Sequence, residues 1–226
     1  MKNPVFELKD IHFSYMPGGA DVLAGLDLTL FEDERIAVTG PTGAGKTTLL
    51  QLMVGLLTPF SGTVNAFGRE RVSEKDFREV RARTGFCFQN PDDQLFCATV
   101  LEDVAFGPLN LGKSRDEALA VSLETLDELG LENYENKVTY RLSGGEKRLV
   151  SLASVLSMRP DVLLLDEPSN GLDDYHSDKL IEILNSINKT IVIVSHNNAF
   201  NEKTCGNFLR LENGQAKPAI SRGTGH

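Results

Sequence analysis

The sequence predicts an α/β fold in which helices cover a parallel sheet. Two short stretches, Val162–Leu165 and Thr190–Val194, are almost wholly apolar, as strands are when both faces of a parallel sheet are buried. A third, largely apolar stretch, Arg35–Thr39, runs into a glycine and is followed by an apolar segment of helical length. With 226 residues, of which 41% are hydrophobic, the chain is long enough for one large domain with a substantial core.

Further strands are predicted in the N-terminal third, where apolar and polar residues alternate. Apolar residues recur from Val5 to Phe13 and again from Leu26 to Leu30. Between these stretches, Pro17–Gly19 has the composition of a turn. Two more strand candidates span residues 63–67 and 84–88. The N-terminal part is therefore expected to be rich in strands.

The middle of the chain predicts helices. Ser114 and Glu117 form a capping-box pattern, in which each side chain bonds the backbone N–H of the other residue. Leu119, Leu123 and Leu126 follow at helical spacing. The remaining expected elements are helices over residues 145–158 and 175–187, and a strand over residues 208–211 that enters a tight hairpin at Asn213-Gly214.

Charge argues against a general nucleic-acid binder. The chain carries 32 acidic and 23 basic side chains, a formal net charge of -9, whereas such proteins present a basic face. A local basic patch stays compatible with this total. The three cysteines, Cys87, Cys97 and Cys205, are few and far apart. They are expected to be reduced thiols, not a disulfide framework or a metal cluster.

No membrane span or signal peptide is expected. The first residues, Met1–Pro4, lead into an alternating segment instead of an apolar run. The stretch Thr47–Gly68 has no charged residue, but it contains Pro59 and three glycines. Its apolar part is limited to Leu49–Leu57, which suits a buried helix better than a transmembrane one.

A phosphate-binding loop is the first motif with clear chemistry. The segment Gly40-Pro41-Thr42-Gly43-Ala44-Gly45-Lys46-Thr47 matches the pattern G-x-x-x-x-G-K-[ST], and a helix is expected from Thr48 to Leu57. Backbone N–H groups of the loop and the helix N-terminus, including Thr48, would hold an anion. Lys46 would reach the β- and γ-phosphates and Thr47 would ligate Mg²⁺. The alternative, an ordinary glycine-rich turn, fits the strand–loop–helix context poorly.

Two carboxylates, Asp166 and Glu167, follow the apolar strand at residues 162–165. The carboxyl end of a strand is where α/β sheets place their ligands. Asp166 suits the Mg²⁺ shell, and Glu167 is placed to orient or deprotonate an attacking water. The alternative is a solvated acidic exit from a strand, which the phosphate loop in the same chain disfavours.

The segment Leu142-Ser143-Gly144-Gly145-Glu146 supplies a second helix N-terminus that is able to grip phosphate oxygens. With this motif, the sequence resembles the nucleotide-binding subunits of ATP-binding-cassette (ABC) transporters, from about Phe6 to Gly214. The resemblance implies one ABC ATPase domain over residues 1–226. Residues 1–88 and 160–226 would form a nucleotide-binding core with an antiparallel β subdomain, and about 89–159 a helical subdomain.

The resemblance also implies roles for single residues. Tyr15 matches the aromatic residue that stacks on adenine, and Gln89 the glutamine that contacts Mg²⁺ and the attacking water. His196 matches the histidine that contacts the γ-phosphate. Asp173 ends the loop Ser169–Asp173, which crosses the interface between two subunits. Taken alone, Tyr15 could simply cap a strand and His196 could be an ordinary surface or core histidine.

In this family two subunits pair head to tail. Ser143, Gly144, Gly145 and Glu146 of one chain would therefore close on ATP held by the other, with ATP and Mg²⁺ as cofactors. Leu149 stands where the family often has arginine, Asn197 where aspartate is common, and Asn170 is uncommon in its loop. These departures leave open the hydrolysis rate and whether the partner is a second copy or a related subunit. The chain stops soon after Gly214, so regulation by an additional C-terminal domain is not expected.

Two segments, Gln89–Phe96 and Glu102–Pro108, look like the energy-coupling-factor branch, especially its cobalt/nickel uptake ATPases. That branch pairs the ATPase with a transmembrane coupling protein and a substrate-capture membrane protein, at the cytoplasmic face of the membrane. A groove here would accept a short helix of the partner, with Leu95 and Phe96 as apolar contacts. Phe106 is expected to belong to the core. Cobalt, nickel and vitamins all stay open as substrates.

Two other functions compete with transport as interpretations of the sequence. A soluble cassette ATPase acting on nucleic acid or ribosomes usually carries two cassettes or a long inserted coiled coil, and this sequence predicts neither. A P-loop kinase or GTPase would lack the Leu142–Glu146 motif. Co-purification with a membrane protein or with RNA separates the first rival, and nucleotide competition tests the second.

Overall fold

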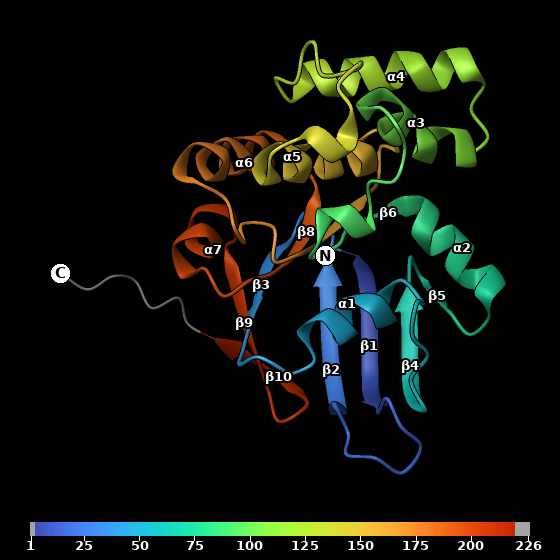
Figure 1. Ribbon diagram of the computed structural model, residues 1–226. Helices are drawn as coiled ribbons and strands as arrows, with labels where there is room; N and C mark the ends of the chain where they lie inside the picture. Colours follow the sequence, from blue (N-terminus) through green and yellow to red (C-terminus); the bar gives the residue numbers. More distant parts are fainter. Residues whose placement is uncertain (1–2, 220–226) are drawn as a thin grey trace.

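The computed structural model describes residues 3–219, which form two sheets and a set of helices (Figure 1). The smaller sheet is antiparallel, with strand order β2-β1-β4-β5; the larger has six strands in the order β10-β9-β3-β8-β7-β6. The strands are β1 (Pro4–Phe13), β2 (Leu23–Phe31), β3 (Arg35–Thr39), β4 (Ser61–Ala66), β5 (Arg69–Glu70), β6 (Thr84–Cys87), β7 (Val162–Asp166), β8 (Thr190–Val194), β9 (Asn207–Glu212) and β10 (Gln215–Ala219). The predicted α/β architecture is confirmed.

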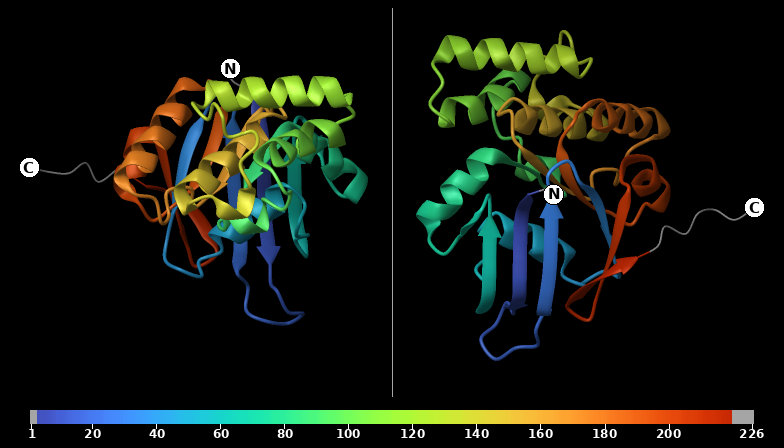
Figure 2. Two further views of the ribbon diagram at one scale, coloured as in Figure 1. Left: turned by 45° about the horizontal axis from the view of Figure 1, so that its top comes forward. Right: turned by 180° about the vertical axis from the view of Figure 1, so that it is seen from behind.

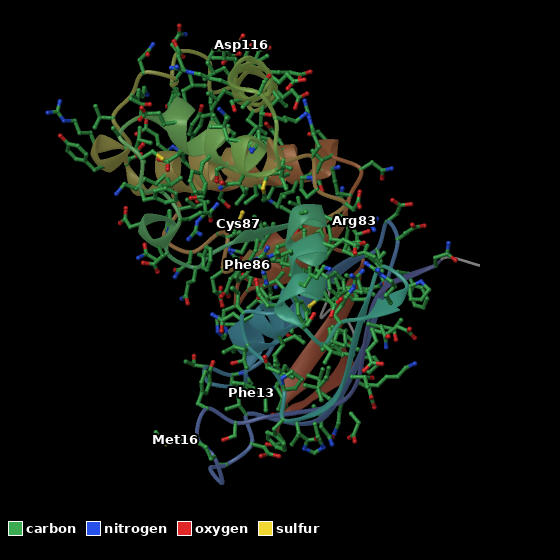
Figure 3. The ribbon with its side chains drawn as sticks, turned by 90° about the vertical axis from the view of Figure 1, so that its right-hand side faces the viewer. Phe13, Met16, Arg83, Phe86, Cys87 and Asp116 are labelled. Carbon is green, nitrogen blue, oxygen red and sulfur yellow. The ribbon has the colours of Figure 1, made fainter. Side chains whose placement is uncertain are left out.

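The helices cover the larger sheet and form a separate helical part beyond it (Figures 1 and 2). They are α1 (Lys46–Met53), α2 (Glu74–Arg83), α3 (Val100–Asn110), α4 (Arg115–Glu128), α5 (Gly144–Leu156), α6 (Asp174–Ser186) and α7 (Asn198–Thr204). In Figure 3, Asp116 on α4 and Met16 on the β1–β2 hairpin mark opposite ends of the molecule, with Phe86 and Cys87 between them. Within residues 3–219, none of the helices combines the length and apolar character that crossing a bilayer requires.

The larger sheet is parallel except for its last strand. Strands β6, β7, β8, β3 and β9 pair in parallel, and β10 returns antiparallel to β9. All residues of β7 and β8 are buried, which explains why only Asp166 and Thr190 at their ends are polar. In the register, Val194 lies opposite both Val38 and Asp166. The segments that follow β3, β7 and β8 therefore leave the sheet side by side.

Two hydrophobic cores lie on opposite faces of this sheet. On one face, Leu164 of β7 packs in a cluster with α1 and the antiparallel sheet. On the other face, Leu163 and Leu165 pack in a cluster with the helices α3 to α7. The alternation along β7 follows from the two-residue period of a strand. The strand β7 thus contributes side chains to both cores.

The predicted hairpin at Asn213-Gly214 is confirmed. Glu212 pairs directly with Gln215, so the connection has two residues, with φ values of 52° and 73°. A two-residue turn with both φ values positive matches the right-handed twist of the strands, and Asn-Gly is its preferred sequence. The capping box at Ser114 is confirmed as well, since the hydroxyl accepts from the Glu117 N–H and the carboxylate accepts from the Ser114 N–H.

Three local predictions are wrong in detail. The first helix ends at Met53 and not at Leu57, because Gly55 adopts φ of 70° and the Phe77 ring occupies the space next to it. Phe106 is 45% exposed and not part of the core, because α3 buries its other face. Leu95, expected as a contact for a partner, is buried.

Several elements have no counterpart in the predictions, namely β5, α2, α3 and α7. The helix α2 illustrates why. It buries only Phe77 and Val80 among ten mostly charged residues, so its hydrophobic periodicity is faint. Its one clear sequence signal is the pair Ser73 and Asp76, which forms a capping box at the N-terminus.

Candidate nucleotide-binding site

A cavity of about 280 Å³ opens where β3, β7 and β8 end. It brings together most of the residues that the sequence singles out, although these come from distant parts of the chain. Its lining consists of Tyr15, Val22, Thr42, Gly43, Gly45, Lys46, Thr47, Thr48, Gln89, Asp166, Glu167, Val194 and His196. The structure therefore places the phosphate loop, the carboxylate pair, Tyr15, Gln89 and His196 at one site.

The loop between β3 and α1 depends on glycine at two places. A Cβ at Gly40 would lie 2.2 Å from the carbonyl oxygen of Leu211, so no side chain fits there. Gly45 has φ of 94° and precedes the first turn of α1 without any side-chain cap. The first N–H groups of α1 are thus left for an external acceptor, and the helix dipole makes an anion the favoured one.

Lys46 lies across the loop at the start of α1. Its ammonium group donates to the carbonyl oxygens of Gly40 and Pro41, both at 3.0 Å, and lies 3.1 Å from Nε2 of His196. The side chain is buried, which lowers the pKa of the amine against the opposing influence of Glu167 and Asp166. The two carbonyl oxygens carry no charge, so a bound phosphate group would give the Lys46 ammonium an anionic partner.

Thr47 and Asp166 form a pair of oxygen donors. The threonine hydroxyl donates to Oδ2 of Asp166 at 2.7 Å. Oδ1 of Asp166 is buried and has no hydrogen-bond partner within residues 3–219. Burial raises the pKa of Asp166, although the Thr47 hydrogen bond opposes that shift. A buried carboxylate with an unpaired oxygen is a group that a cation would stabilise.

Glu167 follows Asp166 in an unusual backbone conformation. Its φ is 46°, which costs a residue with a side chain about 1–3 kcal/mol and is typical of functional sites. The conformation is held by a 2.7 Å hydrogen bond from its N–H to the carbonyl of Val194. The carboxylate accepts from the His196 N–H at 3.2 Å and lies 3.4 Å from Nε2 of that residue. Glu167 and His196 are thus fixed to one another at the cavity.

Tyr15 forms the outer wall of the cavity. Its ring packs edge to face on Phe13, with centroids 5.0 Å apart, and its hydroxyl lies 2.8 Å from Oγ1 of Thr48. The tyrosine is 61% exposed. An exposed aromatic face held in place from behind is suited to stacking on a flat ring.

Arg148 is a functional candidate that the sequence reasoning missed. It lies on α5, 5% exposed, and donates to the carbonyl oxygens of Phe88 at 2.8 Å and of Gln89 at 2.6 Å. The guanidinium therefore fixes the backbone that carries the Gln89 side chain into the cavity. Leu149, one residue later, stands where the resembled family often has arginine, so Arg148 supplies an arginine next to that position.

The second glycine motif lies elsewhere. Neither Ser143–Glu146 nor Asp173 lines the cavity that holds Lys46. Ser143 caps α5, and its capping partner Glu146 also accepts from Tyr134 at 2.8 Å and from Lys137 at 3.1 Å. These hydrogen bonds, the largest effect being that of the Ser143 N–H, lower the pKa of Glu146 to about 2. The Glu146 carboxylate thus stabilises the Ser143–Glu146 turn through these hydrogen bonds.

Asp166 should weaken the nucleotide-free fold. Because burial raises its folded-state pKa above the ordinary 3.8, the ionised carboxylate destabilises the folded chain at neutral pH. We expect Asp166→Asn to raise Tm without nucleotide and to abolish hydrolysis. The gain in Tm should shrink as the pH falls and vanish well below 3.8, where the wild-type carboxylate is neutral in both states. Thermal unfolding across this pH range tests it, and equal Tm values at neutral pH would contradict it.

Comparison with known proteins places this site in a family. The sequence profile of the ABC transporter family matches residues 23–170. A candidate ABC transporter ATP-binding protein of Nitratidesulfovibrio vulgaris is 50% identical over 212 residues, which are 94% of this chain and 78% of that protein. An energy-coupling factor transporter ATP-binding protein of Methanothermobacter thermautotrophicus is 45% identical over 197 residues, which are 85% of this chain and 63% of that protein.

Two solved structures share the fold. One is cbiO1 from Clostridium perfringens, described as part of the ABC transporter complex cbiONQ, with a TM-score of 0.85 and 32% identity over 96% of this chain and 88% of that one. The other is a dimeric ATP-binding cassette in a post-hydrolysis state with ADP and Pi, with a TM-score of 0.86 and 26% identity over 96% of this chain and 99% of that one. The chain therefore belongs to the ABC transporter family, in which it is an ATP-binding subunit with ATPase activity.

Proposed function

We propose that this chain powers the uptake of a small substrate as the ATPase of an energy-coupling-factor transporter, with a cobalt or nickel ion or a vitamin as the cargo. The observation that carries the proposal is an exposed apolar groove on the helical part, close in sequence to Gln89. Relatives support the same direction, since one is an energy-coupling factor protein and one structure is part of a cbiONQ complex. The net charge of -9 gives the nucleic-acid alternative no support.

At the cavity, each residue takes a role that its geometry supports. The N–H groups at the start of α1 and the Lys46 ammonium hold the β- and γ-phosphates, and Tyr15 stacks on the adenine. Glu167 accepts a proton from the attacking water, while His196 and Gln89 orient the γ-phosphate and that water. Thr47 and Asp166 would hold Mg²⁺, with Gln89 nearby, because hydroxyl and carboxylate oxygens are its usual ligands. When bound, Mg²⁺ neutralises charge on the phosphates.

A second subunit completes the site in this proposal. The turn formed by Ser143, Gly144, Gly145 and Glu146, and the loop that ends at Asp173, do not line the cavity of their own chain. In a head-to-tail pair each chain offers them to the nucleotide of the other. The dimeric cassette that shares this fold supports such a pairing. The partner is either a second copy or a related subunit, and residues 1–226 act as one cassette with residues about 89–159 as its helical subdomain.

The membrane partner binds at the apolar groove. The groove has a volume of about 410 Å³ and is lined by Cys97, Ala98, Glu102, Ala105, Phe106, Leu109, Arg115 and Leu119. Phe96, 65% exposed, packs edge to face on Phe106, with centroids 4.8 Å apart. An apolar groove with two exposed aromatic rings at its rim suits the apolar face of a short helix. Through this contact the chain associates with the cytoplasmic face of the membrane.

The groove is testable with the double substitution Phe96→Ser and Phe106→Ser. We expect capture of the membrane partners from detergent-solubilised membranes to fall by about 30-fold, as for loss of aromatic anchors in an interface. The ATPase rate of the isolated subunit should stay within about twofold, since surface substitutions rarely perturb a fold. Leu123→Ser is the matched control, because Leu123 is exposed on α4 outside the groove. Undiminished capture of the partners by the double variant would refute the docking assignment.

A further inference from the structure

Two segments that the proposed dimer offers to its partner meet at one side chain, His176. Asp173 is the N-cap of α6, and its Oδ1 accepts from the His176 N–H at 2.8 Å. The same oxygen lies 2.7 Å from Nδ1 of the His176 ring. The imidazole is thereby held over the end of the Ser169–Asp173 loop, and its side chain is only 17% exposed.

The His176 ring also packs against Gly145. A Cβ built on Gly145 would lie 2.4 Å from Cγ of His176, and also within 2.7 Å of Nδ1 and Cδ2. The imidazole therefore fills the space that any side chain at position 145 would need. Glycine is required here because of this close approach and not for an unusual φ. The N-terminal ends of α5 and α6, which run side by side in Figure 1, are joined through the ring.

The hydrogen bond identifies which ring nitrogen is the donor. Donation from the His176 N–H and from its ring lowers the pKa of Asp173, so the carboxylate is ionised and can only accept. Nδ1 therefore carries the proton and donates. A charge-assisted hydrogen bond on one side and van der Waals contact with a glycine on the other leave the ring one orientation.

We propose that His176 is a positioning residue, which locks the Ser143–Glu146 turn and the Ser169–Asp173 loop in one relative placement. One subunit then presents both segments as a unit to the nucleotide that the other subunit holds. This inference rests on the proposed function, because it needs a second subunit. The inference predicts different effects on two affinities. His176 affects the affinity of the two subunits for each other. It leaves the affinity of the single chain for ATP unchanged, since it does not line the cavity around Lys46.

The test compares these two affinities for His176→Ala in a Glu167→Gln background, where ATP is not consumed. Binding of a fluorescent ATP analogue to dilute monomer should stay within about twofold, while the dissociation constant of the ATP-bound dimer should rise about tenfold, as for loss of one hydrogen bond to a charged group. Asp178→Asn is the control, since Asp178 lies exposed on the same helix and pairs with Lys203 of α7. Unchanged dimerisation, or an equal loss of monomer binding, would overturn the inference.

Two further variants keep the inference testable if His176→Ala does not fold. His176→Phe keeps a ring against Gly145 without the hydrogen bond, and His176→Asn keeps an amide donor for Asp173 without the ring. Each should recover part of the dimer affinity lost in His176→Ala. If that variant is insoluble, each should still dimerise more weakly than the wild type. Dimer affinities equal to wild type in both variants would overturn the inference. If the Glu167→Gln protein itself forms no ATP-dependent dimer, the proposed function fails instead, so the two failures are distinct.

Discussion

Glu167→Gln is expected to lower kcat for ATP hydrolysis by about 10²–10⁴-fold, the usual contribution of a general base. Glutamine has nearly the same shape as glutamate and can still accept the 3.2 Å hydrogen bond from the His196 N–H. It cannot take a proton from water. ATP should therefore still bind between two subunits, and a stable ATP-bound dimer should accumulate.

Steady-state hydrolysis and size-exclusion chromatography with ATP check this result. Glu128→Gln serves as the control, because Glu128 is a surface carboxylate that pairs with Arg159 far from the cavity. That protein should keep the wild-type rate and should not accumulate as a dimer. A normal rate in Glu167→Gln would show that another group accepts the proton.

Lys46→Ala is expected to weaken ATP binding by about 10²-fold and to leave no measurable turnover, since a buried cation that faces an anionic ligand is lost. The fold should survive. The Lys46 ammonium contacts carbonyl oxygens and His196 in the nucleotide-free chain, and its lowered pKa means that burial opposes the charged form. Its removal should therefore leave Tm unchanged or slightly higher.

Isothermal titration with ATP and thermal unfolding separate the loss of binding from a loss of folding. Lys75→Ala is a matched control, since Lys75 is exposed on α2 and lies outside the cavity. Turnover by Lys46→Ala at the wild-type rate would remove the phosphate loop from the mechanism. A sharply lower Tm would mean instead that Lys46 stabilises the fold.

Elements with a contiguous signal could be predicted from the sequence. The bounds of β3 and β8 are those predicted, and β7 extends one residue further, because buried parallel strands are short apolar runs with clear ends. The phosphate loop is likewise a local pattern. The end of α1 could not be predicted, since the Phe77 ring that packs beside Gly55 comes from another helix. The exposure of Phe106 was hidden for the same reason: helical periodicity does not tell which face a neighbour covers.

The residues of the candidate site likewise include some that the sequence predicts and some that it does not. Lys46, Asp166 and Glu167 belong to motifs that can be recognised one at a time, and the structure gathers them at one cavity. Arg148 and His176 act through backbone carbonyls and a glycine contact, which leave no pattern in a single sequence. The positive φ of Glu167 is equally invisible, because glutamate has no preference for it.

Arg148 anchors α5 to the backbone of Phe88 and Gln89, beside the candidate nucleotide site. The helix has 13 residues and is therefore about 20 Å long. Besides Arg148, it is fastened to the segment after β6 by Lys147, at 2.5 Å from Asp92, and by the Ser151 carbonyl, which accepts from Gln94 at 2.8 Å. The C-terminal end of the helix at Leu156 lies about 12 Å along the axis from Arg148, so a tilt of about 10° at Arg148 would displace that end by about 2 Å. A shift of the segment that carries Gln89 would thus reach the C-terminal end of α5 through these hydrogen bonds.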